Sequence, residues 1–150
     1  DGKYSLNKKW VGKDASLFLK ELGIASDARL IIMETESSHP FVQEELMMPI
    51  LPIVRVNNIS EAIRLAVEAE HGNRHSAHIH SKNVDHLTAF ARAVETTIFV
   101  KNAPSYAGIG AGGEGHTTFT IAGPTGEGLT SARSFTRQRR CVLVDGFHII

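Results

Sequence analysis

The stretch that decides the fold covers residues 102–128 and reads NAPSYAGIGAGGEGHTTFTIAGPTGEG. Its glycines, densest over residues 108–115, allow left-handed backbone torsions and let a ligand or another chain segment approach bare amides closely. A regular helix or strand does not tolerate glycine at this density. We therefore expect a loop that wraps a ligand or a neighbouring segment.

Residues 108–113 of this loop, GIGAGG, match the dinucleotide-binding fingerprint G-x-G-x-x-G by letter. The fingerprint binds a pyrophosphate only where a strand leads straight into the glycines and a helix begins at them. Here residues 102–107 separate the preceding apolar run from the glycines, and the β-branched residues 117–121 that follow favour a strand. The sequence therefore argues against a Rossmann fingerprint in this loop.

Composition narrows the class of protein. The 150 residues suffice for one core, and 16 basic and 16 acidic side chains give a formal net charge of zero. This balance argues against a nucleic-acid partner, and the run Arg137, Arg139, Arg140 fits a solvated strand edge at least as well as a phosphate site. The longest apolar run, residues 46–54, contains two prolines and is too short to span a membrane.

The ends of the chain and its cysteine content bear on location. Cys141 is the single cysteine, so no internal disulfide is possible, which suits a reducing cytoplasm. The chain opens on Asp1 rather than on methionine, and no signal-like segment follows. We expect a cytoplasmic protein and a piece of a longer one.

Helical stripes and apolar runs alternate along the chain, and this βαβ rhythm predicts one continuous α/β unit with a largely parallel sheet. Asp14 and Ser60 are expected to cap helices, the second of which ends at His71 and Gly72. The predicted helices cover residues 15–22, 61–71 and 84–94, with a helical turn within 40–48. The predicted strands cover residues 30–33 and 50–56, both expected to be buried, then 75–80, 97–101, 117–122 and 139–144.

Several motifs carry a resemblance to a known family. EELMMP at residues 44–49, followed by a strand, a capped helix and SKNVDHL at 81–87, is similar to the C-terminal half of an aldehyde dehydrogenase. FVKN at 99–102, PSYAGIGAGGEG at 104–115 and the long run 117–147 resemble the coenzyme-A-acylating acetaldehyde and propionaldehyde dehydrogenases of bacterial microcompartments. The resemblance implies that residues 1–150 are the C-terminal part of the catalytic domain, with about 134–150 as a terminal oligomerisation segment.

This resemblance implies a reaction between a short-chain aldehyde, NAD and coenzyme A. A cysteine thiolate attacks the aldehyde, the adduct gives hydride to NAD, and the resulting thioester passes to the thiol of coenzyme A. The nucleophile of such enzymes lies upstream of the EELMMP motif, so no catalytic residue is expected in this chain. Cys141, in a predicted apolar strand, is expected to be a structural residue instead. A homo-oligomer joined through the C-terminal strand is also implied, in the cytoplasm or the lumen of a microcompartment.

Glu45 is the cofactor-binding residue that the resemblance implies. Its position matches the glutamate that accepts hydrogen bonds from the nicotinamide ribose hydroxyls, a role that suits a carboxylate because it offers two acceptor oxygens and no donor. From spacing alone, Glu45 reads as a solvated acid at a helix end. Met47 and Met48 depart from the aromatic residue and the glycine that are common in the superfamily, so the wall around the nicotinamide is expected to differ in shape.

The resemblance also implies an aldehyde pocket beside the glycine-rich loop, with small residues leaving room for the acyl chain and the incoming thiol. An alternative for Tyr106 and Ile109 is ordinary packing. The pocket residues that the resemblance implies are Ser105, Tyr106, Ile109, Phe119 and Ile121.

The sequence offers two other interpretations. His75, His78 and His80 have a spacing that can hold zinc or nickel, but no acid or cysteine nearby completes a site, so we expect exposed polar histidines and no metal. The other interpretation is a stand-alone, non-catalytic domain that binds a nucleotide or a partner subunit. An upstream nucleotide-binding half that carries a cysteine would distinguish the enzyme from this alternative.

Overall fold

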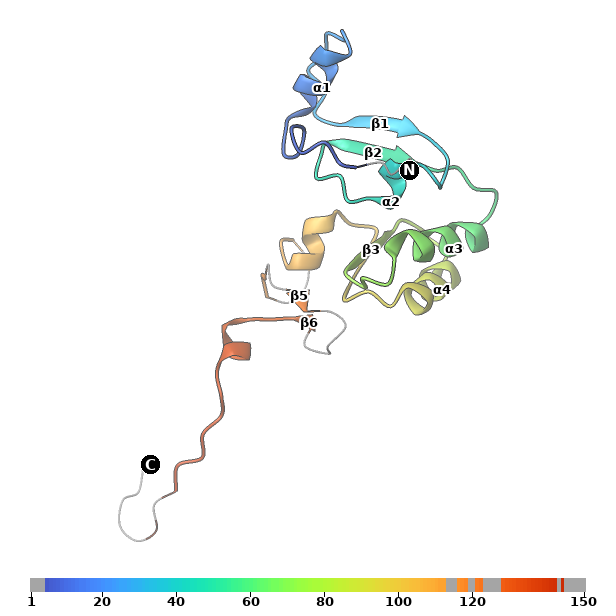
Figure 1. Ribbon diagram of the computed structural model, residues 1–150. Coiled ribbons are helices and arrows are strands. Elements are labelled where there is room, and N and C mark those ends of the chain that lie inside the picture. Colours follow the sequence, from blue (N-terminus) through green and yellow to red (C-terminus); the bar gives the residue numbers. More distant parts are fainter. Residues whose placement is uncertain (1–4, 113–115, 119–120, 123–127, 143, 145–150) are drawn as a thin grey trace. The chain divides into compact units, whose positions relative to one another are not determined.

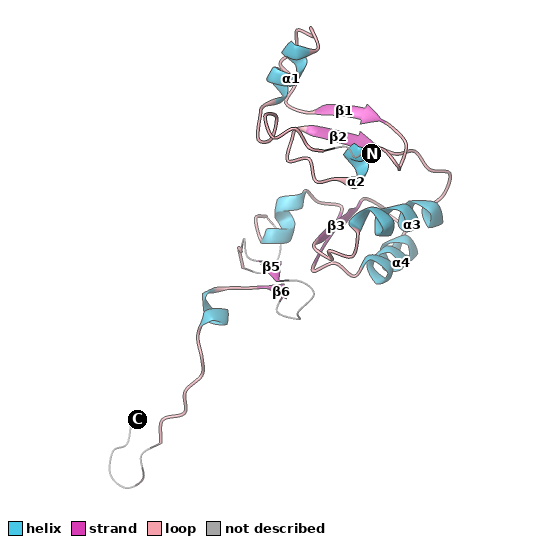
Figure 2. Ribbon diagram, in the orientation of Figure 1, coloured by secondary structure: helices cyan, strands magenta, loops and turns pink. Residues whose placement is uncertain are grey.

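The computed structural model describes residues 5–112, 116–118, 121–122, 128–142 and 144 (Figure 1). Two compact units divide the chain, Asp1–His71 and Gly72–Ile150. Helices and strands alternate along most of it, as the sequence predicts (Figure 2). The elements are α1 (Ala15–Glu21), β1 (Ile31–Glu34), α2 (Pro40–Gln43), β2 (Ile50–Ile53), α3 (Ile59–Glu70), β3 (Ser76–Ile79), α4 (Val84–Val94), β4 (Ile98–Lys101), the 3-10 helix η1 (Ser105–Ile109), β5 (Ile121–Ala122), β6 (Gly128–Leu129) and the 3-10 helix η2 (Ala132–Phe135).

In the first unit, β1 and β2 pair in parallel, with Ile31 opposite Ile50 and Glu34 opposite Ile53. The short helix α2 begins after His39, whose Nδ1 accepts a hydrogen bond from the Phe41 backbone N–H at 3.1 Å. The prediction that both strands are buried is wrong, because the two strands alternate between half-buried and exposed residues. Burial of the second face needs a covering element, and none of the described elements of this unit supplies it.

The observed helix ends can be compared with the caps predicted from the sequence. Asp14 precedes α1 as predicted, although its side chain makes no capping hydrogen bond. The cap of α3 is Asn58 rather than Ser60, because the Asn58 Oδ1 accepts from the Glu61 backbone N–H at 2.9 Å and places Ser60 inside the first turn. His71 ends α3 in the left-handed conformation, with φ 56°, which confirms the predicted end.

In the second unit, β3 and β4 pair in parallel, and α4 has the predicted bounds. Asn83 caps α4 by accepting hydrogen bonds from the backbone N–H groups of Asp85 and His86. The rings of Phe90 and Phe99 meet edge to face, with centroids 5.6 Å apart. This strand pair and its helix hold the core of the unit, whose buried side chains include Ala77, Phe90, Val94, Ile98 and Val100.

Among the described residues the strands pair two by two, and the alternation of helices with parallel strands agrees with the predicted α/β class. The parallel strands form two separate pairs, and β5 pairs with β6 in antiparallel orientation. Residues 139–142 and 144, the described part of the predicted terminal strand, belong to no strand within this single chain. A strand exists only when its backbone is hydrogen-bonded to another, and no described segment pairs with this one. Cys141 is accordingly exposed rather than buried.

Candidate functional site in the EELMMP turn and the glycine-rich loop

The EELMMP turn joins α2 to β2 and is fixed by its backbone. Met47 has a left-handed φ of 51°, an uncommon conformation for a residue with a side chain. Its carbonyl accepts a hydrogen bond from the Gly12 N–H at 2.9 Å. Leu46 beside it is buried. The turn therefore has one anchored backbone group and one anchored side chain next to Glu45.

The Glu45 carboxylate is exposed and makes no hydrogen bond or ion pair with any residue that the structure describes. Its neighbours Glu44 and Leu46 line a cavity of about 340 Å³, together with Met33 and Phe41. Because the backbone at Glu44 is extended, successive side chains point to opposite sides, and Glu45 is not part of that lining. Two adjacent glutamates thus face different surroundings, and both oxygens of Glu45 are free for a ligand.

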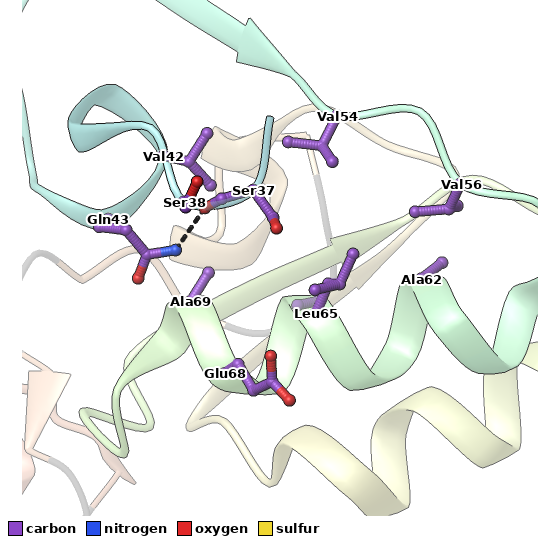
Figure 3. A pocket seen from close by; sticks show the side chains of 11 residues that line it. Ser37, Ser38, Val42, Gln43, Val54, Val56, Ala62, Leu65, Glu68 and Ala69 are labelled. Carbon is purple, nitrogen blue, oxygen red and sulfur yellow. Dashed lines mark hydrogen bonds between the residues drawn. The ribbon is translucent and has the colours of Figure 1, made fainter. Parts of the chain in front are cut away.

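A larger groove of about 610 Å³ lies in the same unit, between residues 37–43, the segment after β2 and one face of α3 (Figure 3). The two longer polar side chains of its lining, Gln43 and Glu68, are already paired. The Gln43 Nε2 donates to the Ser37 carbonyl at 2.6 Å, and Glu68 is bonded to Arg64 at 2.8 Å. Apart from Ser37 and Ser38, the remaining lining is aliphatic, and Glu45 does not contribute to it. This groove therefore has the character of a packing surface.

The glycine-rich loop wraps other segments of its own chain. Gly108 lies in η1, and a Cβ there would overlap the Cγ2 of Ile98 and lie 2.9 Å from that of Val100. Gly110 has φ 91°, and a Cβ on it would lie 2.7 Å from the His116 carbonyl oxygen. The expected close approach is confirmed for a neighbouring chain segment. No strand leads directly into Gly108, which agrees with the rejection of the Rossmann fingerprint.

The structure brings three of the five predicted pocket residues together on η1. Ser105 and Tyr106 are exposed, and Ile109 is half-buried, with its carbonyl accepting from the Thr118 N–H at 3.1 Å. Phe119 lies outside the described residues. Ile121 begins β5, and its side chain is likewise outside the description. Glu45 belongs to the first unit and η1 to the second.

Two residues that the sequence reasoning missed occupy notable places. The Asn102 side chain joins the ends of β3 and β4, since its Oδ1 accepts from the Ser81 N–H at 2.8 Å and its Nδ2 donates to the Ser81 carbonyl at 2.9 Å. The sequence signal for this bridge is that polar residues follow both β3 and β4. Thr130 is buried, and its Oγ1 has no hydrogen-bond partner among the residues that the structure describes. Nothing in its sequence neighbourhood marks it.

The histidine stretch forms no metal site in the described part of the chain. His75, His78 and His80 are all exposed, and the His75 Nδ1 lies 2.7 Å from the Ser76 Oγ. Among the residues described, no group of three or more histidine, cysteine or acidic side chains could hold a metal ion.

None of the described helices is both long enough and apolar enough to cross a membrane.

Comparison with known proteins identifies the family. Residues 28–136 match the model of the aldehyde dehydrogenase family. The chain belongs to the aldehyde dehydrogenase family. The acetaldehyde dehydrogenase (acetylating) EutE of Salmonella typhimurium is 52% identical over 151 residues, covering 99% of this chain. The propanal dehydrogenase (CoA-propanoylating) of the same species is 55% identical over 146 residues, covering 95%. This aldehyde dehydrogenase chain spans 32% of the length of each of these two relatives.

Solved structures of similar proteins confirm the α/β fold. A propionaldehyde dehydrogenase of Rhodopseudomonas palustris, with bound CoA and an acylated cysteine, is 60% identical over 92% of this chain, with a TM-score of 0.84. A propionaldehyde dehydrogenase from the fucose utilisation microcompartment of Clostridium phytofermentans is 59% identical over 95%, with a TM-score of 0.85. This chain covers 33% of each of the two structures. The resemblance drawn from the motifs is therefore confirmed.

Proposed function

We propose that this chain is the C-terminal part of a CoA-acylating aldehyde dehydrogenase, which converts a short-chain aldehyde, NAD and coenzyme A to acyl-CoA and NADH. The observation that carries the proposal is the identity of 52% and 55% to an acetylating acetaldehyde dehydrogenase and a CoA-propanoylating propanal dehydrogenase over nearly the whole chain. One similar structure contains CoA and an acylated cysteine. Another, an engineered glycolyl-CoA reductase 60% identical to this chain, contains NADP+.

The nucleophile of the reaction is supplied by a part of the polypeptide outside these residues. Cys141 lies on an exposed segment without secondary structure. An exposed segment without secondary structure does not hold a thiol in attack geometry. The purified chain should therefore form no NADH from propionaldehyde and coenzyme A. Sustained NADH formation that Cys141→Ser abolishes would contradict this assignment.

Glu45 holds the nicotinamide ribose in this proposal. The free, exposed carboxylate fits two hydroxyl donors, and the anchored Leu46 and Met47 beside it fix the backbone from which it projects. Bound NAD supplies the hydride acceptor. Charge-assisted hydrogen bonds to the ribose are roughly twice as strong as neutral ones, so this side chain orients the ring for transfer.

The test of this role is Glu45→Gln in the complete enzyme, with Glu44→Gln as the matched control. An amide puts a donor against the ribose hydroxyls, and a displacement on the order of 1 Å could slow hydride transfer about a hundredfold. Attack by the cysteine needs no alignment of the nicotinamide. Stopped-flow NADH appearance should therefore fall far more than acylation by an activated ester, while Glu44→Gln leaves both steps unchanged. Equal losses in both steps for Glu45→Gln would make it a structural acid only.

The acyl pocket in this proposal lies beside η1, where Tyr106 presents an exposed ring and Ser105 and Ile109 flank it. Phe119 and Ile121 complete the proposed lining. Tyr106→Ala in the complete enzyme should relax the preference between propionaldehyde and a bulkier aldehyde, because removing a ring from an apolar pocket wall frees volume. An unchanged ratio of kcat/KM values for the two aldehydes would assign Tyr106 to packing.

The segment 134–150 joins subunits in this proposal. Its described part contains exposed arginines and the exposed Val142 and Val144, a composition suited to pairing with a neighbouring strand. A complete protein truncated before Ser134 should lose its oligomeric mass in light scattering, whereas an unchanged mass would contradict the assignment.

The fucose microcompartment origin of one similar structure supports a location in the cytoplasm or in such a compartment.

A further inference from the structure

One face of the β1–β2 pair presents a row of large apolar side chains to solvent. Ile32 is 62% exposed and stands opposite Leu51, which is 47% exposed. Leu30 precedes Ile32 by two residues and Ile53 follows Leu51 by two, so the alternation of strand residues puts all four on the same side. Leu30 and Ile53 are 48% and 40% exposed. We call these four side chains the bare face.

Parallel strands are covered by helices on both faces in folded proteins, because the crossover connections between them place helices there. The sequence of the two strands fits that rule, since residues 30–33 read LIIM before Glu34 ends β1, and β2 reads ILPI. The bare face also has a defined edge. At the carboxyl end of the two strands Glu34, which stands opposite Ile53, forms an exposed ion pair of 2.7 Å with Arg55, and this pair raises the pKa of Arg55. An apolar centre with a charged rim is the arrangement of an interface.

We propose that the bare face is the docking surface for an apolar helix of the segment that precedes residue 1 in the complete polypeptide. This inference rests on the proposed function, in which the chain is the C-terminal part of a longer enzyme. The relatives supply the length for such a helix, since the chain spans only 32% of them. A helix is the expected occupant because helices are what cover parallel sheets.

The docked helix would also hold the proposed cofactor residue in place. β2 begins directly after the EELMMP turn, and the Ile50 N–H donates to the Met48 carbonyl at 2.8 Å. Fixing Leu51 and Ile53 against a neighbour therefore restricts the strand from which the turn departs. The contact would make the geometry at Glu45 depend on the upstream segment.

The test measures access to the bare face in the complete protein. Ile32→Cys and Leu51→Cys are introduced singly with Cys141→Ser, and alkylation by N-ethylmaleimide is followed peptide by peptide with mass spectrometry. The matched control is Glu36→Cys, at an exposed polar position two residues beyond β1. We expect alkylation at 32 and 51 to be at least about a hundredfold slower than in urea, and Glu36→Cys to react at nearly its unfolded rate. Fast alkylation at 32 and 51 would overturn the proposal.

The occupant is identified in the unsubstituted protein by incorporating photo-leucine, a diazirine analogue of similar size. Cross-links from Leu30 or Leu51 to a peptide upstream of residue 1 support the proposal. Cross-links to residues 72–150 or to a second polypeptide overturn it. Neither measurement depends on activity, so a complete protein that forms no acyl-CoA but protects positions 32 and 51 would contradict the proposed function alone.

Discussion

The two parallel strand pairs differ in burial, although β1–β2 (IIME and ILPI) is no less apolar than β3–β4 (SAHI and IFVK). In β3–β4, Ala77, Ile98 and Val100 are buried to 5–7% exposure, whereas no side chain of β1 or β2 is buried. The difference lies in what the same unit supplies to cover each pair. α4 packs against β3 and η1 packs against β4, whereas the helix that packs against β2 is α2, which has four residues and no buried side chain. The burial of an apolar strand therefore depends on the elements that pack on it, and the burial of β1–β2 depends on elements outside its unit.

The largest difference between the pairs should appear when one isoleucine is truncated in each. Ile98→Ala removes a buried side chain and should lower the free energy of unfolding by about 2–5 kcal/mol. Ile32→Ala removes a side chain that is 62% exposed, and in the 150-residue chain it should change that free energy by less than about 0.5 kcal/mol. Urea denaturation of both variants measures this. Comparable losses would show that the two pairs are equally covered.

A smaller effect on the free energy of unfolding should come from the contact between Gly108 of η1 and the side chains of β4. Gly108→Ala places a methyl group against the Cγ2 atoms of Ile98 and Val100, and overpacking of this kind costs about 1–3 kcal/mol. Alanine at position 98 lacks the Cγ2 atom that the new methyl group would meet there. Gly108→Ala should therefore cost at least about 0.5 kcal/mol less in an Ile98→Ala background. Unfolding of the two single variants and the double variant gives this coupling. Strictly additive losses would mean that η1 does not rest on Ile98.

Local signals explain how much of the fold the sequence could predict. The bounds of α4 and the end of α3 at His71 depend on caps and stripes within a few residues, and both predictions were right. The burial of β1–β2 and the strand at residues 139–144 depend on partners far along the chain or outside it, and the described residues form neither by themselves. Local patterns do not contain that information.

The candidate site was less accessible to reasoning from the residues. Spacing alone made Glu45 a solvated acid, and only the resemblance carried by the EELMMP motif gave it a role. The bridge that Asn102 makes to Ser81 was missed because it joins residues 21 positions apart. The Gly108 contact was anticipated in kind, since glycine implies close approach, but its partners follow only from the fold.

The smallest predicted effect concerns the caps of α3 and α4, which differ in what else holds each helix. α4 buries Phe90 and Val94, whereas α3 buries no side chain, so α3 depends more on its cap. Asn58→Ala removes the acceptor for the Glu61 N–H and should cost about 1 kcal/mol, which makes amide hydrogen exchange at Glu61 about fivefold faster. Ser60→Ala, inside the first turn, should leave that rate unchanged or slightly lower it, because alanine is the better helix former. Asn83→Ala removes the same kind of cap from α4, but the buried side chains should keep exchange in its later turns unchanged. Faster exchange in Ser60→Ala than in Asn58→Ala would return the cap to Ser60.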